Sequence, residues 1–141
     1  MFIGSLALTA AALFTGTAFY VGFAEQTSRL ALDDRALLAE WKSSYQRGSK
    51  MAVPLVILGF LLGVAAWWQS DRGAFLAGAL LMIANGPSTL LVIMPTNRAL
   101  MANRLENSGP LSRSQIIKWN RLHLVRTMLG GIAILAFLIA V

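Results

Sequence analysis

Four long apolar segments alternate with shorter polar or charged stretches along the chain. The apolar segments cover residues 2–24, 51–69, 74–94 and 122–141. A helix of about 20 apolar residues spans the hydrocarbon core of a bilayer, which is about 30 Å thick. Because unpaired peptide groups are costly in lipid, all four segments are predicted to be transmembrane helices. The first segment lacks the basic start of a cleaved signal peptide, so we expect it to remain in the mature protein.

The stretches between the segments predict how the helices are connected. Residues 70–73 form a connection so short that the second and third helices must make an antiparallel hairpin. Between the first and second segments, apolar residues recur at helical spacing among charged ones, which predicts an amphipathic helix along the membrane surface. Those apolar residues are Leu30, Leu37, Leu38, Trp41 and Tyr45. The third helix is expected to continue through Leu105, to break at 107–110 and to restart at Ser112, where Gln115 completes a capping-box pattern.

The composition agrees with a membrane protein. Of the 141 residues, 57% are hydrophobic and 13% are charged, whereas about 25% of residues are charged in ordinary soluble domains. We therefore interpret residues 1–141 as a single integral membrane domain with an all-α fold. The expected architecture is a four-transmembrane-helix bundle with a cytoplasmic surface helix between helices 1 and 2 and cytoplasmic extensions of helices 3 and 4. The absence of cysteine excludes disulfides, thiolate metal sites and cysteine nucleophiles.

The distribution of positive charge predicts the orientation in the membrane. Residues 25–50 and 95–121 each hold five basic residues, whereas the short hairpin holds only Arg72. The positive-inside rule places both long connections in the cytoplasm and both chain ends outside, with the plasma (inner) membrane as the expected location. The net charge of +6 does not indicate nucleic-acid binding, because the basic residues lie where anionic lipid is the nearer partner.

Two features inside the apolar segments suggest how the helices pack. Small or hydroxyl-bearing residues repeat at spacings of three and four in the first segment, namely Ser5, Thr9, Ala12, Gly16 and Tyr20. This face is expected to be a packing seam, with a ligand groove or a homo-oligomer contact as the alternatives. Asn85, Gly86 and Pro87 lie near the centre of the third segment and predict a kink. A purely structural kink is the favoured interpretation, and a cavity with polar lining is the alternative.

The candidate chemistry lies at the inner end of the helices. Arg126 is within the last segment, where insertion of an arginine at the bilayer centre costs about 2.5–3.5 kcal/mol, and Glu25 is its expected partner by depth. Trp119, His123 and Arg126 follow spacings of four and three and therefore share one helix face. Further candidates expected at this level are Asn97, Trp41 and Tyr45. The cluster is interpreted either as an active site or as a set of interfacial anchors with a neutralising ion pair.

Several of these residues form blocks that resemble the anthrone-oxygenase-like family, a domain of unknown function found in small four-helix membrane proteins. The more specific blocks read VIMPTNRAL from Val92 and WNRLHLVR from Trp119. Supporting matches are Glu25, Ser28, Arg29, Leu30, Trp41, Ser44, Tyr45 and Arg47. The chain departs from the family pattern at Gln26 and Thr27, where His-Pro is common. It also departs at Gly86 and Ser88, where bulky aromatic residues are common, so its pocket is expected to have more room.

The resemblance implies an activity for the candidate residues. The family is named after fungal members implicated in converting anthrones to anthraquinones with molecular oxygen and no dedicated cofactor. It implies a flat hydrophobic aromatic substrate that loses a C–H proton and is then oxygenated. His123 would be the general base, Glu25 would orient it, and Arg126 would stabilise the enolate oxygen. The expected substrate-binding residues are Asn97, Trp119, Tyr20, Tyr45, Trp41 and Asn85.

Other functions remain open from the sequence. Glu25 and His123 provide at most two metal ligands, fewer than the three protein ligands of a typical catalytic zinc, so no metal site is predicted. Haem bound through the single His123 is not excluded. The competing class of function is a non-catalytic membrane scaffold, binding or transport module, in which the polar cluster is structural.

Overall fold

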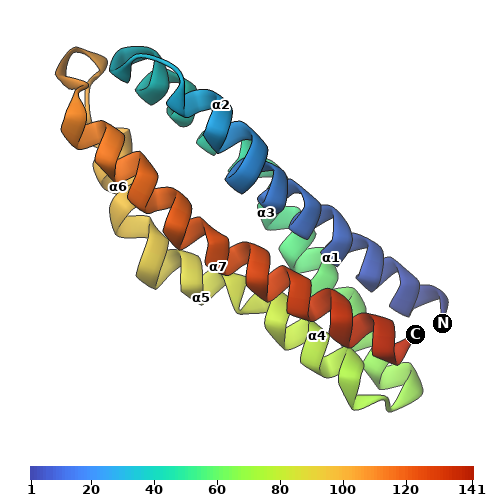
Figure 1. Ribbon diagram of the computed structural model, residues 1–141. Helices are drawn as coiled ribbons and strands as arrows, with labels where there is room; N and C mark the ends of the chain where they lie inside the picture. Colours follow the sequence, from blue (N-terminus) through green and yellow to red (C-terminus); the bar gives the residue numbers. More distant parts are fainter.

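The computed structural model describes all 141 residues as four long helices joined by tight turns (Figure 1). The first long helix consists of α1 (Phe2–Tyr20), a π-helical turn (Val21–Glu25) and α2 (Gln26–Leu30). The second is α3 (Asp34–Ser70). The third consists of α4 (Gly73–Ile83), α5 (Asn85–Ser88), a π-helical turn (Thr89–Ile93) and α6 (Met94–Ala102). A single 3₁₀ turn (Leu105–Asn107) leads into the last, α7 (Pro110–Ala140).

The four helices form an antiparallel bundle. The helix α1 packs against α3 and α7, and α4 packs against the same two helices on the opposite side. Both chain termini and the α3–α4 turn lie at one end, the terminal end, and the other two turns lie at the opposite end, the loop end (Figure 1). Each long helix contains a stretch long and apolar enough to cross a membrane. The predicted all-α bundle of four candidate membrane-spanning helices is therefore confirmed.

The amphipathic segment before the second apolar segment is helical, but it is not the separate surface helix that the sequence pattern suggested. It is the first part of α3 and runs without interruption into the apolar part. Leu37, Leu38 and Trp41 are completely buried by packing against other helices, not laid against lipid. The side chain of Asp33 begins α3 by accepting hydrogen bonds from the backbone N–H groups of Arg35 and Ala36, both at 3.0 Å.

The predicted packing seam of the first helix is wrong. All five residues of that face, Ser5, Thr9, Ala12, Gly16 and Tyr20, are exposed on the outside of the bundle. The hydroxyls of Ser5 and Thr9 donate to carbonyls one turn earlier, at 3.1 and 2.8 Å, which satisfies them on an apolar surface. The buried face carries Ala7, Ala11 and Phe14, so small residues occur on both faces and small size alone does not identify the seam.

The expected kink is present in the third long helix. The helix is interrupted at Ala84, between α4 and α5, and continues after Pro87 through a π-helical turn. Pro87 has no N–H group to donate to the carbonyl one turn earlier, so the series of helical backbone hydrogen bonds is weakened at this point. The side-chain amide of Asn85 donates to the carbonyls of Leu81 at 3.3 Å and Met82 at 3.1 Å and so occupies backbone acceptors beside the interruption.

Basic side chains stabilise the turns at the loop end by donating hydrogen bonds to backbone carbonyls. The connection between the third and the last long helix differs there from the sequence prediction. The third helix ends at Ala102, not beyond Leu105, because Lys42 donates to the carbonyls of Met101 and Asn103. The last helix begins at Pro110, before the predicted Ser112. The hydroxyl of Ser112 accepts from the Gly109 N–H at 3.0 Å and donates to the Gly109 carbonyl at 2.9 Å. Arg113 forms an ion pair with Asp34 and donates to the carbonyls of Leu30, at the end of α2, and of Leu32, in the turn that follows.

Two hydrophobic cores follow one another along the bundle. The larger core, toward the terminal end, is built around Phe14, Phe75, Met82 and Phe137. The smaller core, toward the loop end, contains Leu37, Leu38, Trp41, Ile93, Leu100, Ile116 and Trp119. The apolar packing is therefore interrupted at mid-bundle, and polar side chains occupy the layer between the cores.

The close approach of helices at Gly63 predicts a difference between two glycine substitutions. A methyl group at Gly63 would lie 2.9 Å from both the Ala79 Cβ and the Phe137 ring, whereas one at Gly131 would meet open space. Gly63→Ala is expected to lower the free energy of unfolding by about 1–3 kcal/mol, and Gly131→Ala to leave it unchanged or slightly raised. Denaturant titration in detergent measures both changes. Equal stability of the two variants would contradict the packing described here.

Candidate functional site

Arg126 lies in the polar layer without a counter-ion. It forms no ion pair or hydrogen bond with any other group, and its buried Nε atom has no partner. Its guanidinium carbon lies 5.3 Å from the centre of the Phe14 ring, close enough for a cation–π contact. The positive charge of Arg126 is therefore held against an aromatic face at the edge of the larger core, with its polar edge free.

His123 lies one helical turn from Arg126 on the same inward face of α7. Its side chain is 7% exposed, and both ring nitrogens lack a hydrogen-bond partner. The imidazole stacks on the indole of Trp119, with ring centres 4.8 Å apart and planes inclined by 24°. The predicted common face of Trp119, His123 and Arg126 is thus observed, and it places one unpartnered imidazole beside one unpartnered guanidinium.

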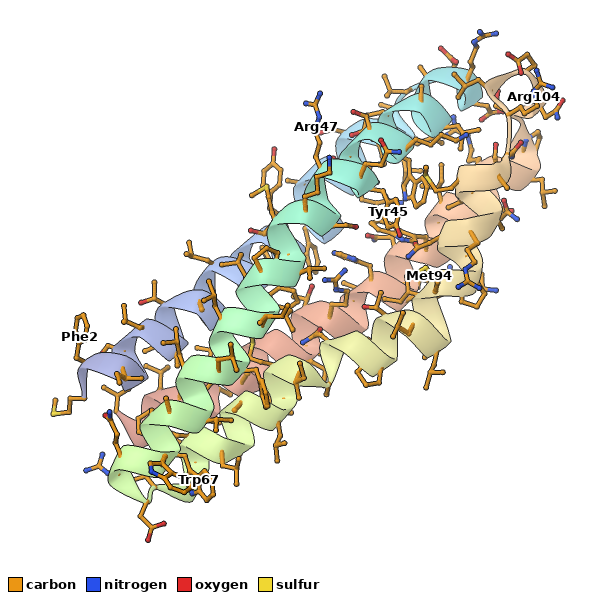
Figure 2. The ribbon with its side chains drawn as sticks, turned by 180° about the vertical axis from the view of Figure 1, so that it is seen from behind. Phe2, Tyr45, Arg47, Trp67, Met94 and Arg104 are labelled. Atoms are coloured by element: carbon orange, nitrogen blue, oxygen red, sulfur yellow. The ribbon has the colours of Figure 1, made fainter.

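Arg126 and Tyr45 lie at the junction of two hollows. The inner cavity, about 40 Å³, lies between α1, α3 and α7 and is lined by His123, Arg126, Ser44 and Tyr45. The slot, about 340 Å³, lies between α3 and the bent third helix. Its lining from α3 is Tyr45, Ser49, Val53, Val56 and Ile57, and its lining from the bent helix is Ile83, Asn85, Gly86, Thr89, Leu90 and Met94, with Arg126 from α7. Figure 2 shows Tyr45 and Met94 facing each other across the bundle, whereas Arg47 points away from it.

The slot exists because the third helix bends. The segments α5 and Thr89–Ile93 pack against α7, while α3 contacts α4 toward the terminal end and α6 toward the loop end. Asn85 lies at the bend with 2% of its surface exposed, and its Oδ1 atom has no hydrogen-bond partner. A methyl group at Gly86 would meet no atom within 4 Å. The bend therefore adds a polar acceptor and free space to the wall of the slot.

Glu25 does not form the expected ion pair with Arg126. Its carboxylate instead contacts Arg29 one turn along the helix, with 2.7 Å between Glu25 Oε1 and Arg29 Nη2, and accepts a hydrogen bond from Ser44. Arg29 also contacts Glu40, with 2.9 Å between Nε and Oε2, and its Nη2 donates to Ser44 Oγ at 3.1 Å. Arg29 is 2% exposed. The prediction that Glu25 lies at the depth of Arg126 is wrong: the neighbouring Gln26 contacts the Ile116 carbonyl, toward the loop end, whereas Arg126 lies beside Phe14.

Two carboxylates therefore share a single arginine. Glu40 lies in the loop-end part of α3, well before the apolar segment 51–69. Burial raises the pKa of Glu40 to about 7, the neighbouring Glu25 adds to the rise, and Arg29 opposes it. Burial and the repulsion between the two neighbouring carboxylates favour a state in which the pair retains one proton near neutral pH, although Arg29 opposes it.

A row of aromatic rings connects the other predicted binding residues. Trp41 stacks on Tyr45 with ring centres 5.0 Å apart and meets Trp119 edge to face at 5.6 Å. The Trp119 Nε1 atom donates to Asn97 Oδ1 at 2.8 Å, so Asn97 orients the indole and does not face the inner cavity. Tyr20 is 61% exposed and lies with Glu25 in an open groove between the first long helix and α3. Of the aromatic candidates, Tyr45 and Trp119 line the inner cavity.

No group of three or more His, Asp or Glu side chains is arranged to hold a metal ion. The groups that converge at the inner cavity are one imidazole, one guanidinium and the hydroxyls of Ser44 and Tyr45. Such a set can accept a proton and stabilise a negative charge in a largely apolar enclosure.

A comparison with family models decides which family the chain represents. The model described as anthrone oxygenase matches residues 41–136, more than half of the chain. The chain belongs to the anthrone oxygenase family. Neither the curated proteins nor the solved structures contain a significant match to it.

The anthrone oxygenase match includes most of the polar layer. It begins at Trp41 and covers Tyr45, Asn85, Asn97 and the whole inward face of α7 that carries His123 and Arg126. It does not cover Glu25 or Arg29. The sequence resemblance included Arg29, but no role was assigned to it. Its spacing of four residues from Glu25 is the signal that predicts the observed pair.

The shared arginine predicts a large effect of its removal on stability. Arg29→Leu leaves two partly buried carboxylates without a cation, and we expect the free energy of unfolding to fall by about 3 kcal/mol. Arg104→Leu breaks only the exposed Arg104–Glu106 pair and should cost less than about 1 kcal/mol. Denaturant titration of both variants in detergent tests the difference. Similar small losses of stability in both variants would show that Arg29 does not contribute substantially to the stability of the bundle.

Proposed function

We propose that the protein oxidises a small, flat, hydrophobic aromatic ketone with molecular oxygen in the polar layer between the two cores. The observation that carries the proposal is the pair formed by His123 and Arg126. Neither group forms an ion pair or a hydrogen bond with another side chain, and both line the same inner cavity. A purely structural role does not explain why an imidazole and a guanidinium line the inner cavity without side-chain partners. Membership of the anthrone oxygenase family supports the reaction class.

The proposed reaction uses the residues in separate roles. His123 takes the acidic C–H proton of an anthrone-type ketone, and Arg126 stabilises the oxygen of the resulting enolate. The enolate gives one electron to oxygen, and the two radicals combine at the former C–H carbon to form a peroxide. Protonation and loss of water from the hydroperoxide leave a quinone. One oxygen atom enters the product, and the other leaves as water with the two hydrogens of the oxidised carbon.

The slot supports access for such a substrate from the side. Val53, Ile57 and Leu90 line it and are each about half exposed on the outside of the bundle. Its volume of about 340 Å³ falls in the range of pockets for small organic ligands. An apolar molecule dissolved in lipid could therefore pass between α3 and α5 to reach Arg126 without crossing water. The unpartnered Asn85 Oδ1 is available to accept a hydrogen bond from a hydroxyl of the substrate.

Oxygen uptake by the purified protein with anthrone tests the activity. We expect consumption of one oxygen molecule per anthrone, with a loss of about 10²–10⁴-fold in His123→Ala and about 10²–10³-fold in Arg126→Gln. Arg121→Gln is the matched control, because Arg121 is exposed on the same helix and lines neither hollow. Full turnover in both folded site variants would show that the site is wrong. Absence of oxidation in the folded wild type would favour the scaffold, binding or transport alternative.

We also propose that the loop end faces the cytoplasm and that both termini lie outside, in the plasma (inner) membrane. The concentration of basic residues in the two long connections supports this orientation. Because the chain has no cysteine, Ser70→Cys and Asn107→Cys each introduce one exposed thiol at opposite ends of the bundle. A membrane-impermeant maleimide added to intact cells should label only the Ser70→Cys protein. Labelling of only the Asn107→Cys protein would reverse the orientation.

A further inference from the structure

We propose that the slot binds its aromatic ligand as an anion, a phenolate or enolate whose negative charge compensates Arg126. This inference rests on the site of the proposed function, but it concerns the ligand's charge and not its turnover. It predicts that the protein selects acidic, hydroxylated aromatic compounds over neutral ones of the same shape.

The distribution of acidic groups supports the inference, because no carboxylate in the chain is available to Arg126. The chain has six acidic residues. Glu25 and Glu40 both contact Arg29. The other four lie at the ends of the bundle: Asp34 contacts Arg113, Glu106 contacts Arg104, Asp33 caps α3, and Asp71 ends α3. The protein therefore holds a cation between its two cores and provides no anion for it.

The surroundings of Arg126 make an anionic ligand favourable. A charge removed from water without a partner is costly, and an entering anion would recover part of that cost. No other arginine or lysine lines either hollow, so one negative charge is sufficient. The face of Phe14 covers the guanidinium on one side, which leaves the N–H edge for the ligand.

The lining of the slot favours an aromatic body over a membrane lipid. Arg126 is fourteen residues from the end of α7 at Ala140, about 21 Å along the helix, which leaves it about 9 Å inside the opposite surface of a bilayer core of about 30 Å. Tyr45 lines the slot and belongs to the row of rings formed with Trp41 and Trp119. A flat ligand entering beside Tyr45 would extend this row.

The test uses 2-hydroxyanthraquinone, which is already oxidised and changes colour when its phenol ionises. The full-length protein is placed in nanodiscs of uncharged phosphatidylcholine, and the visible spectrum of the bound dye is followed against pH. The apparent pKa of the dye is expected to fall by about one unit or more on binding to the wild type, which corresponds to tenfold tighter binding of the phenolate. The shift should disappear in Arg126→Gln and persist in Arg121→Gln.

A neutral ligand of the same shape tests whether the Arg126→Gln variant still forms the slot. Unsubstituted anthraquinone, measured by quenching of tryptophan fluorescence, should bind wild type and Arg126→Gln within about twofold, which shows that the slot is intact. A dye that binds without a shift, or with the same shift in Arg126→Gln, would overturn the inference. Displacement of the dye by oleate at equal affinity would also overturn it, in favour of a fatty-acid site. Oxidation of anthrone without the dye shift refutes only this inference, whereas the shift without oxidation refutes only the proposed activity.

Discussion

The sharing of Arg29 by Glu25 and Glu40 is the interaction on which the arrangement of the polar layer depends. It joins the first long helix to α3 at a buried position, and the arginine also lies 5.7 Å from the centre of the Trp119 ring on α7. Because both nearby carboxylates are engaged there, Arg126 has none to pair with. Arg29 therefore joins helices through its two carboxylates, whereas Arg126 has no carboxylate partner, although both arginines lie inside the same bundle.

The two hydrophobic cores give this layer its rigidity. One core fixes the helices toward the terminal end and the other fixes them toward the loop end, so the groups between them are positioned from both sides. The bend at Asn85 then separates the third helix from α3 over a limited length and produces the slot. A site of this kind needs no loop to close over it, because its walls are helices held at both ends.

The sequence was sufficient to predict the four helices, the hairpin, the bend at Asn85 and the common face of Trp119, His123 and Arg126. These features follow from local apolar length, proline chemistry and helical spacing. It was not sufficient for the Glu25 partner, because the pattern placed Glu25 level with Arg126, whereas the structure places Glu25 nearer the loop end, beside Arg29. The packing face of α1 was also missed, because Ala7 and Ala11 on one side and Ala12 and Gly16 on the other are equally small. The amphipathic pattern at 30–45 also did not distinguish burial against other helices from contact with lipid, and the structure buries Trp41 completely in the bundle.

The π-helical turn at Val21–Glu25 determines which side chains of the first helix reach the interior. Ala18, Gly22, Gln26 and Arg29 are buried, and a π-helical turn holds more residues than a regular α-helical turn, so the winding between Ala18 and Arg29 differs from that of a regular α-helix. Removing one residue from this turn would restore regular winding and rotate α2 by about 100° about its axis. Arg29 would then swing away from Glu40, and the helix would still look intact by length and hydropathy. Alignments of related chains should therefore be anchored separately on the two sides of this turn.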